Sequence, residues 1–83
     1  MTLTTLTERQ REIALLVGRG LSYTEIAATL TNLRSFRRST VSPRTVLIHV
    51  QAIDRQLHGT VEGSTPYRRV MRWVLEQQKA AAA

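Results

Sequence analysis

The sequence predicts an all-α fold, a single domain of four helices, and two observations support this. Apolar residues recur at three- and four-residue intervals in four separate segments, which is the period of an amphipathic helix. Threonine, serine and proline, the residues that cap or begin helices, stand directly before these segments. The chain of 83 residues suits one small domain, placed at 1–79. The alanines at 80–83 are left outside it, as either native sequence or a cloning remnant.

The first predicted helix follows Thr7. Gln10 stands three residues later, at the reciprocal position of a capping box, and the helix runs to about Arg19. Gly20 ends it, because glycine readily adopts the left-handed conformation that terminates helices. Its apolar stripe consists of Ile13, Leu16 and Val17.

The second predicted helix begins after Ser22. Glu25 follows three residues later, which is again the capping-box spacing, and the helix runs from Tyr23 to about Leu30. Its inward residues are Ile26, Ala27 and Leu30. The backbone N–H groups and hydroxyls at its start, on Ser22, Tyr23 and Thr24, could hold a phosphate in addition to capping the helix.

An extended loop is predicted at 31–40, where hydrophobic periodicity is lost, either wholly irregular or with a short helical turn. It is long for a connection between helices of a small domain, and long ordered loops are often functional. Arg34, Arg37 and Arg38 lie in it. These arginines either follow a nucleic-acid backbone or belong to a flexible solvated loop.

The third predicted helix has Ser42 as N-cap and Pro43 at its first position, and ends near Leu57. At 100° per residue its buried stripe comprises Val46, Val50, Ile53 and Leu57. The opposite side carries Arg44, Ile48, Gln51 and Arg55.

The fourth predicted helix opens at Pro66, after Ser64 or Thr65, and runs to about Lys79. Its inward residues are Tyr67, Val70, Met71, Val74 and Leu75. Trp73 lies beside this stripe, where it either packs in the core or forms part of a dimer contact.

Positive charge is concentrated in the middle of the chain. The net charge is +6, and 11 of the 12 basic residues are arginine. Residues 1–30 are neutral overall, whereas residues 31–55 carry five arginines against Asp54. This distribution suggests a polyanionic partner for the middle segment.

The outward face of the third helix suits the major groove of DNA. Arginine pairs with guanine, glutamine pairs with adenine, and an apolar side chain can meet a thymine methyl group. An ordinary solvated face is the alternative, but such a face seldom needs the β-branched Ile48 opposite the core stripe. Ile48 could equally meet the loop or another subunit.

The segments LTERQREIALLVGRGLSYTEIAATL and VSPRTVLIHVQAIDRQL resemble the LuxR/GerE-type helix-turn-helix domain over residues 6–57. The resemblance implies a four-helical fold that binds double-stranded DNA through its third helix and often dimerises through its fourth. The matching positions include Leu6, Thr7, Glu12, Gly20, Ser22, Glu25, Ile26, Ala27, Val41, Ser42, Thr45, Val46, His49, Ile53 and Leu57.

The residues and the resemblance together define three candidate sets. The residues expected to face bases are Arg44, Leu47, Ile48, Gln51 and Arg55. Those expected to contact phosphates are Ser22, Tyr23, Thr24, Arg34, Arg37, Arg38, Ser42 and Thr45. Those expected at a dimer or partner contact are Tyr67, Val70, Trp73 and Val74.

Three departures from the family pattern leave an alternative open. Ten residues separate Leu30 from Val41, where the family has about one; Leu47 stands where the family usually has lysine; and the link into the last helix differs. These changes imply either altered base preference or a fold turned to protein binding. LSYTEIAATL also resembles part of sigma factor region 4 more weakly, so a module that binds RNA polymerase or a sigma factor is the second hypothesis.

Other function classes find little support in the sequence. There is no cysteine, no metal-ligand cluster and no glycine-rich phosphate loop, so neither an enzyme nor a bound metal or cofactor is expected. With few aromatic residues, single-stranded nucleic-acid binding is a weaker third possibility. Without an apolar run of membrane-spanning length or a signal-peptide pattern, a cytoplasmic, nucleoid-associated protein is expected.

Overall fold

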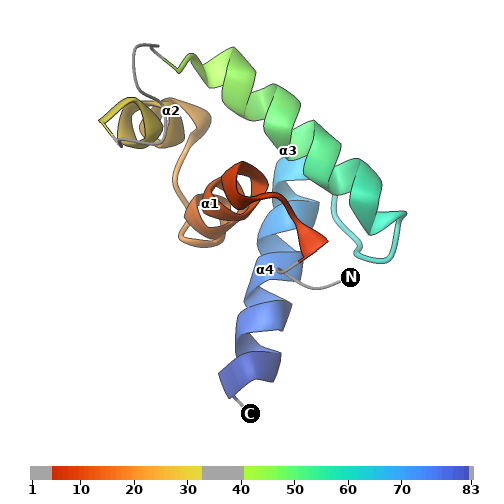
Figure 1. Cartoon of the computed structure of the whole chain (residues 1–83). Helices are drawn as coiled ribbons and strands as arrows, with labels where there is room; N and C mark the ends of the chain where they lie inside the picture. The colour runs from red at the N-terminus through yellow and green to blue at the C-terminus, as the bar shows by residue number, and fades with distance from the viewer. Residues whose placement is uncertain (1–4, 33–40, 83) are drawn as a thin grey trace.

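The computed structural model describes residues 5–32 and 41–82 and confirms the all-α fold (Figure 1). The four helices are α1 (Glu8–Gly18), α2 (Tyr23–Asn32), α3 (Pro43–Leu57) and α4 (Pro66–Ala82).

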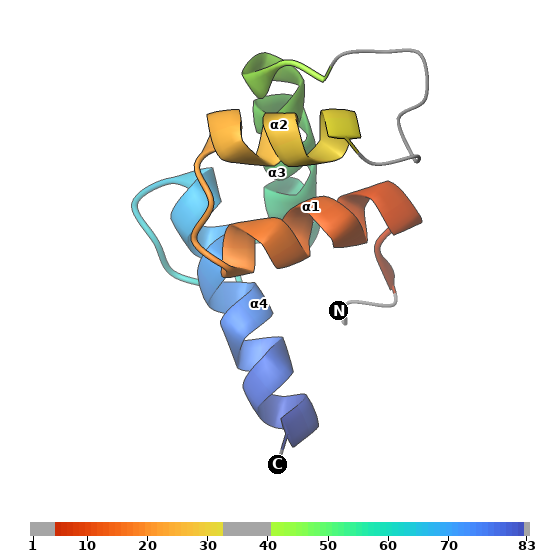
Figure 2. The same cartoon turned by 90° about the vertical axis from the view of Figure 1, so that its left-hand side faces the viewer.

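Helix α1 occupies the centre of the fold, packed against both α3 and α4 (Figures 1 and 2). Helix α2 packs on α3, and α3 also packs on α4. The last turns of α4 extend beyond the other helices, towards the C-terminus. One side of α3 therefore faces the three other helices, and its outer side is left uncovered by them.

The core forms where the apolar stripes of the four helices meet. The third-helix stripe is buried as predicted, with Val46, Val50 and Ile53 fully inaccessible. Leu6, Val41 and Val61 extend the core from the segments between and before the helices. The other buried apolar residues are Ile13, Ala14, Val17, Ile26, Ala27, Leu30, Leu57, Val70, Trp73 and Val74.

Hydroxyl side chains cap the helices at the predicted starts. The capping box of α2 is complete: Ser22 Oγ accepts from the Glu25 N–H at 3.1 Å, and the Glu25 carboxylate accepts from the Ser22 N–H at 2.9 Å. Thr65, rather than Ser64, caps α4, since its hydroxyl accepts from the Arg68 N–H at 3.1 Å. The capping hydroxyls are those of Thr7, Ser22, Ser42 and Thr65.

Helix α2 continues to Asn32, two residues beyond the predicted end near Leu30, so the first two residues of the predicted loop are helical. The reason is the side chain of Thr31, whose hydroxyl donates to the Ala27 carbonyl at 2.8 Å and accepts from the Val41 N–H at 3.1 Å. The last turn of α2 is thereby joined to the segment that leads into α3. The rest of the predicted loop, 33–40, lies outside the described residues.

Helix α4 differs from its prediction at two points. Leu75 is not an inward residue: it is 49% exposed, because α4 turns the other edge of its stripe, at Trp73, into the core. The helix also passes the predicted end at Lys79 and continues to Ala82.

Helices α1 and α4 approach closely at Gly18. A Cβ atom added there would lie 2.6 Å from Val74 Cγ1 on α4, and Val74 is fully buried. Two residues later Gly20 has a φ of +83°, the left-handed conformation predicted for the end of the first helix.

Candidate nucleic-acid interface

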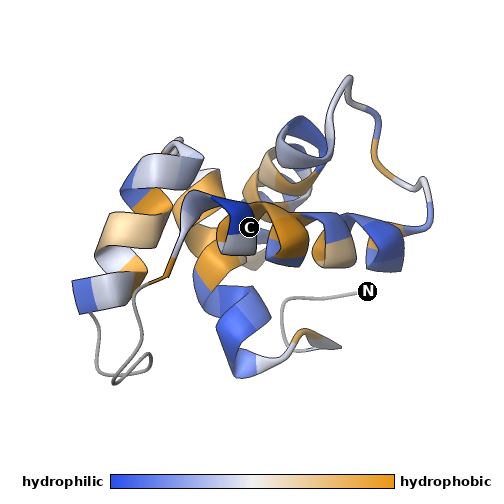
Figure 3. Cartoon of the chain, turned by 90° about the horizontal axis from the view of Figure 1, so that it is seen from above, coloured by the Kyte–Doolittle hydropathy of each residue, from blue (hydrophilic) through white to orange (hydrophobic). Residues whose placement is uncertain are grey.

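The outer side of α3 presents one row of exposed side chains. Arg44, Ile48, Gln51 and Arg55 are all exposed, as predicted, and Ile48 has 55% of its surface open to solvent. Figure 3, which looks onto α3, shows hydrophilic and hydrophobic segments alternating along this helix. We refer to these four residues as the α3 row.

The remaining base-facing candidate, Leu47, is half-buried beside the row. It therefore offers less surface to a partner than Ile48 does. The structure brings together the four members of the row, with Leu47 at their margin.

The single acidic residue of α3 does not oppose the positive charge of the row, because Asp54 is paired with Arg69 of α4. Arg69 Nε donates to Asp54 Oδ1 at 2.7 Å and Nη2 donates to Oδ2 at 2.9 Å. Its third contact is from Nη1 to the Gly63 carbonyl at 2.8 Å. These hydrogen bonds lower the pKa of the Asp54 carboxyl below the ordinary value of 3.8, against the opposing effect of burial.

With Asp54 paired to Arg69, Arg44 and Arg55 are the charged members of the α3 row. Arg55 directly follows Asp54 in the chain, but the bidentate pair directs the carboxylate towards α4. The surface is therefore more favourable to an anion than the sequence charge of α3 suggests.

The start of α2 holds the predicted phosphate-contacting residues in two different environments. Ser22 and Thr24 are exposed. Tyr23 is half-buried against the core, and its ring meets that of Tyr67 edge-to-face, with centroids 5.5 Å apart and planes at 88°. Burial raises the pKa of both tyrosines, so they stay protonated over the neutral range.

Tyr67 of α4 supports the turn between α1 and α2. The Tyr67 hydroxyl donates to the Leu21 carbonyl at 2.6 Å. Leu21 directly precedes Ser22, so α4 holds the backbone that leads into α2.

The start of α3 is held by Ser42 and Thr45. The Thr45 N–H donates to Ser42 Oγ at 3.2 Å, and the two hydroxyls lie 3.0 Å apart. Both residues flank Arg44 on the first turn of α3, so these phosphate-contacting candidates adjoin the row. The other phosphate-contacting candidates, Arg34, Arg37 and Arg38, lie outside the described residues.

Of the residues considered for a dimer or partner contact, three lie inside the monomer: Val70 and Val74 are inward, as predicted for the stripe of α4, and Trp73 packs in the core, the first of its two predicted roles. They are therefore not available to a partner. Val70 and Val74 are fully buried and Trp73 is 3% exposed, because α1 and α3 pack against this side of α4. Tyr67 is half-buried by its contacts with the α1–α2 region. The large apolar side chain that α4 does expose is Leu75.

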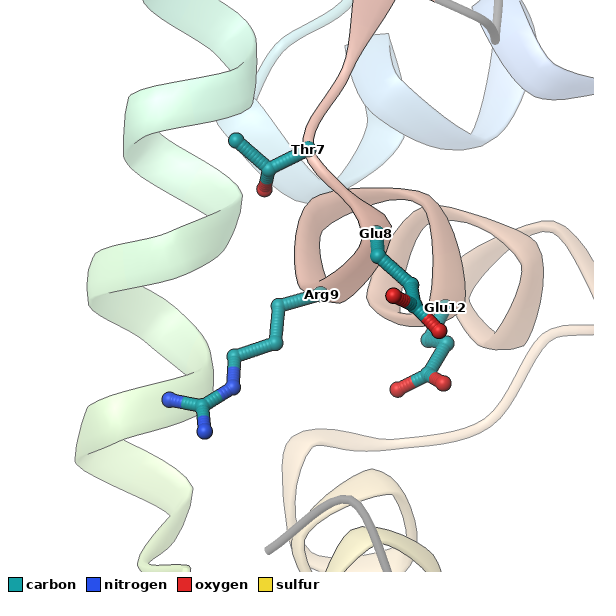
Figure 4. Close-up of a pocket in the computed structure, with 4 residues that line it drawn as sticks. All are labelled: Thr7, Glu8, Arg9 and Glu12. Atoms are coloured by element: carbon teal, nitrogen blue, oxygen red, sulfur yellow. The ribbon is translucent and has the colours of Figure 1, made fainter.

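Two hollows lined by described residues lie on other parts of the surface. One, of about 460 Å³, lies at the start of α1, and its described lining is Thr7, Glu8, Arg9 and Glu12. Figure 4 shows the Arg9 guanidinium directed away from the two carboxylates. With two carboxylates and a capping threonine in its lining, this hollow does not suit a polyanion.

The second hollow, of about 330 Å³, lies between α4 and the segment that precedes it. Met71 and Leu75 supply its apolar surface, and Arg68 and Arg72 lie beside them. Its remaining lining residues are Glu62, Gly63 and Ser64.

Three contacts that join different elements of the fold could not be predicted from the sequence pattern. They are the pairs Asp54–Arg69, Thr31–Val41 and Tyr67–Leu21. Each joins residues of different elements, and helical periodicity carries no information about such pairings.

Comparison with protein-family models, with curated proteins and with solved structures finds no match to this chain. None of the helices in residues 5–32 and 41–82 combines the length and apolar character needed to cross a membrane. Within the same residues, no three histidine, cysteine or acidic side chains gather where they could hold a metal ion.

Proposed function

We propose that this protein is a sequence-specific double-stranded DNA-binding transcriptional regulator of the LuxR/GerE type, with α3 in the major groove. The observation that carries the proposal is the exposed α3 row, combined with the pairing of Asp54, the one acidic residue of α3, to Arg69. The row offers hydrogen-bond donors and one apolar side chain, which are the groups that read base edges in that groove.

The length of the row fits a short recognition site. At a rise of about 1.5 Å per residue, Arg44 and Arg55 are separated by roughly 16 Å along α3. Base pairs stack about 3.4 Å apart, so one helix of this length spans about five base pairs. This is the footprint of a single half-site rather than of a long operator.

Phosphate contacts would come from residues beside the row. Ser22 and Thr24 are exposed at the start of α2, which packs on α3. Backbone N–H groups at a helix start attract phosphate oxygens. Arg34, Arg37 and Arg38 are proposed to follow the DNA backbone and to supply salt-dependent attraction.

The proposal includes a homodimer through α4. Because Trp73 is buried, the dimer contact is proposed on the exposed face of α4 instead. The exposed face of α4 offers Leu75, with Arg72 and Glu76 forming an ion pair at 3.5 Å beside it. If a dimer on this face reads DNA with both copies of α3, its half-sites are expected about one helical turn apart on a near-palindromic target.

The second candidate function is a protein-interaction module that binds RNA polymerase or a sigma factor. The hollow beside α4 favours it, since its apolar residues and arginines would suit an acidic partner with an apolar side chain. In that case deletion of residues 33–40 or replacement of Leu75 would abolish capture of polymerase, and affinity for bare DNA would be weak and unselective.

Selection of binding sites from random duplex DNA at two salt concentrations tests the proposal. We expect one short sequence to be enriched, and affinity for it to fall by an order of magnitude or more as salt rises. Enrichment of an inverted repeat would support the dimer. Failure to enrich any sequence at either salt concentration would refute sequence-specific DNA binding.

A further inference from the structure

The outer side of α3 carries a single exposed aliphatic side chain in the middle of polar ones. Ile48 is 55% exposed, with exposed Arg44 one turn before it and exposed Gln51 one turn after it. Val46 and Val50 lie fully buried on the opposite side of the helix. The core is therefore already filled, and Ile48 remains outside it.

The first side-chain torsion of Ile48 is restricted. A β-branched residue within a helix has one strongly preferred χ1 rotamer, so its methyl groups project in a fixed direction. Its contact with a partner costs little side-chain entropy, unlike a contact made by a long flexible side chain. This arrangement suits recognition of one small apolar group at a defined position.

The size of the apolar spot argues for a small group rather than a protein surface. A protein interface buries about 800 Å² per partner around an apolar centre. In the described part of the chain the large hydrophobic residues that stand exposed are Ile48 and Leu75, on different helices. One isoleucine between an arginine and a glutamine does not provide such a centre.

We infer that Ile48 makes this protein a reader of the C5-methyl group of pyrimidines, an inference that rests on the proposed binding of α3 in the major groove. Among the base edges in that groove, the thymine methyl is the apolar group. Uracil lacks it, and 5-methylcytosine carries the same methyl at the same ring position. The protein therefore distinguishes thymine from uracil, and methylated from unmethylated cytosine.

The neighbouring arginine specifies the sequence around this methyl group. Arg44 lies four residues before Ile48, or about 6 Å along the axis, which is less than two base steps. Arginine donates to guanine O6 and N7. The methyl-bearing pyrimidine is therefore expected within about two base pairs of a guanine.

The test uses the duplex enriched from the random library. Each thymine is replaced in turn by uracil, which removes only the methyl group and leaves base pairing unchanged. At one position we expect the wild-type protein to lose about fourfold in affinity, the effect of one buried methyl group. Cytosine at that position should bind more weakly than 5-methylcytosine by a similar factor.

Variants of Ile48 assign the effect to this side chain. Ile48→Ala should bind the thymine duplex several-fold more weakly and should no longer distinguish uracil, whereas Ile48→Val should keep most of the discrimination. Gln78→Ala is the control, because it removes an exposed, uncharged side chain from α4 and lies outside the residues proposed for DNA or dimer contact. Its discrimination should equal that of the wild type.

The outcomes separate this inference from the proposed function. If the wild-type protein binds the duplex selectively but tolerates uracil at every position within twofold, the methyl-reading inference is overturned and DNA binding stands. If Ile48→Ala retains the discrimination, the inference is overturned as well. If no duplex is enriched at all, the proposed function fails and the inference fails with it.

Discussion

The hydroxyl of Thr31, at the end of α2, accepts a hydrogen bond of 3.1 Å from the backbone N–H of Val41, two residues before α3 begins. The same hydroxyl donates to the Ala27 carbonyl at 2.8 Å. One side chain thus connects the two helices of the proposed DNA-binding unit. The hydrogen bond therefore joins the last turn of α2 to the residue that precedes the N-cap of α3.

Replacement of Thr31 by valine tests this connection. The change preserves the shape of the side chain but leaves the partly buried Val41 N–H without its acceptor, which should cost about 1 kcal/mol of stability. Thr29→Val is the matched control, since the Thr29 hydroxyl bonds only within its own helix, to the Glu25 carbonyl at 2.8 Å. Chemical denaturation measures both variants, and equal losses from the two would contradict a connecting role for Thr31.

The Asp54–Arg69 pair should make stability depend on pH. Asp54→Asn should lower the melting temperature by about 5 °C at neutral pH, because a bidentate, partly buried pair is lost. The folded state lowers the pKa of Asp54 below 3.8, so the stabilisation is complete above the pKa of the unfolded chain. It is lost as the pH falls through the lower, folded-state value.

Thermal melts of the wild type and Asp54→Asn should therefore converge as the pH falls below about 4. Glu76→Gln provides the control, because its ion pair with Arg72 is longer, at 3.5 Å, and largely exposed. This variant should melt close to the wild type throughout. A difference between wild type and Asp54→Asn that persisted unchanged at low pH would rule out the ion pair as its source.

The close approach of α1 and α4 predicts that Gly18 does not tolerate a side chain. Gly18→Ala should destabilise the fold by about 1–3 kcal/mol through overpacking against Val74, which exceeds the gain in helix propensity. Gly20→Ala meets no neighbouring atom within 4 Å, so its cost should come from backbone strain alone, at about 1–2 kcal/mol.

A double-mutant cycle distinguishes the two causes. Val74→Ala creates a cavity that the Gly18→Ala methyl group can partly fill. The double variant should therefore lose less unfolding free energy than the two single variants lose in sum. Gly20→Ala should instead add to Val74→Ala. Additivity of Gly18→Ala with Val74→Ala, measured by denaturant unfolding, would contradict the predicted contact.

The sequence was most informative where structure depends on neighbours in the chain. Helix starts such as Ser22 with Glu25 could be predicted because capping is a local interaction over three residues. The burial of Val46 and the exposure of Ile48 followed from helical period alone. Most of the α3 row could therefore be predicted from the sequence alone, without knowledge of how the other helices pack.

Features that depend on packing between distant segments could not be predicted in this way. Trp73 and Leu75 both border the apolar stripe of α4, and periodicity does not indicate which edge the neighbouring helices will cover. In the same way, Asp54 counts in the sequence as a negative charge on α3. Its neutralisation by Arg69 depends on how α4 crosses α3.

The most direct test of the central claim compares two variants of equal charge. Arg44→Ala/Arg55→Ala removes both arginines of the α3 row, and Arg19→Ala/Arg68→Ala removes two exposed arginines outside it. If α3 lies in the major groove, the first pair should weaken binding to the selected duplex at least tenfold more than the second, since each base contact is worth about 1–3 kcal/mol. Equal losses in a fluorescence titration would show that net charge alone drives binding, and would contradict the α3 row as the DNA-reading surface.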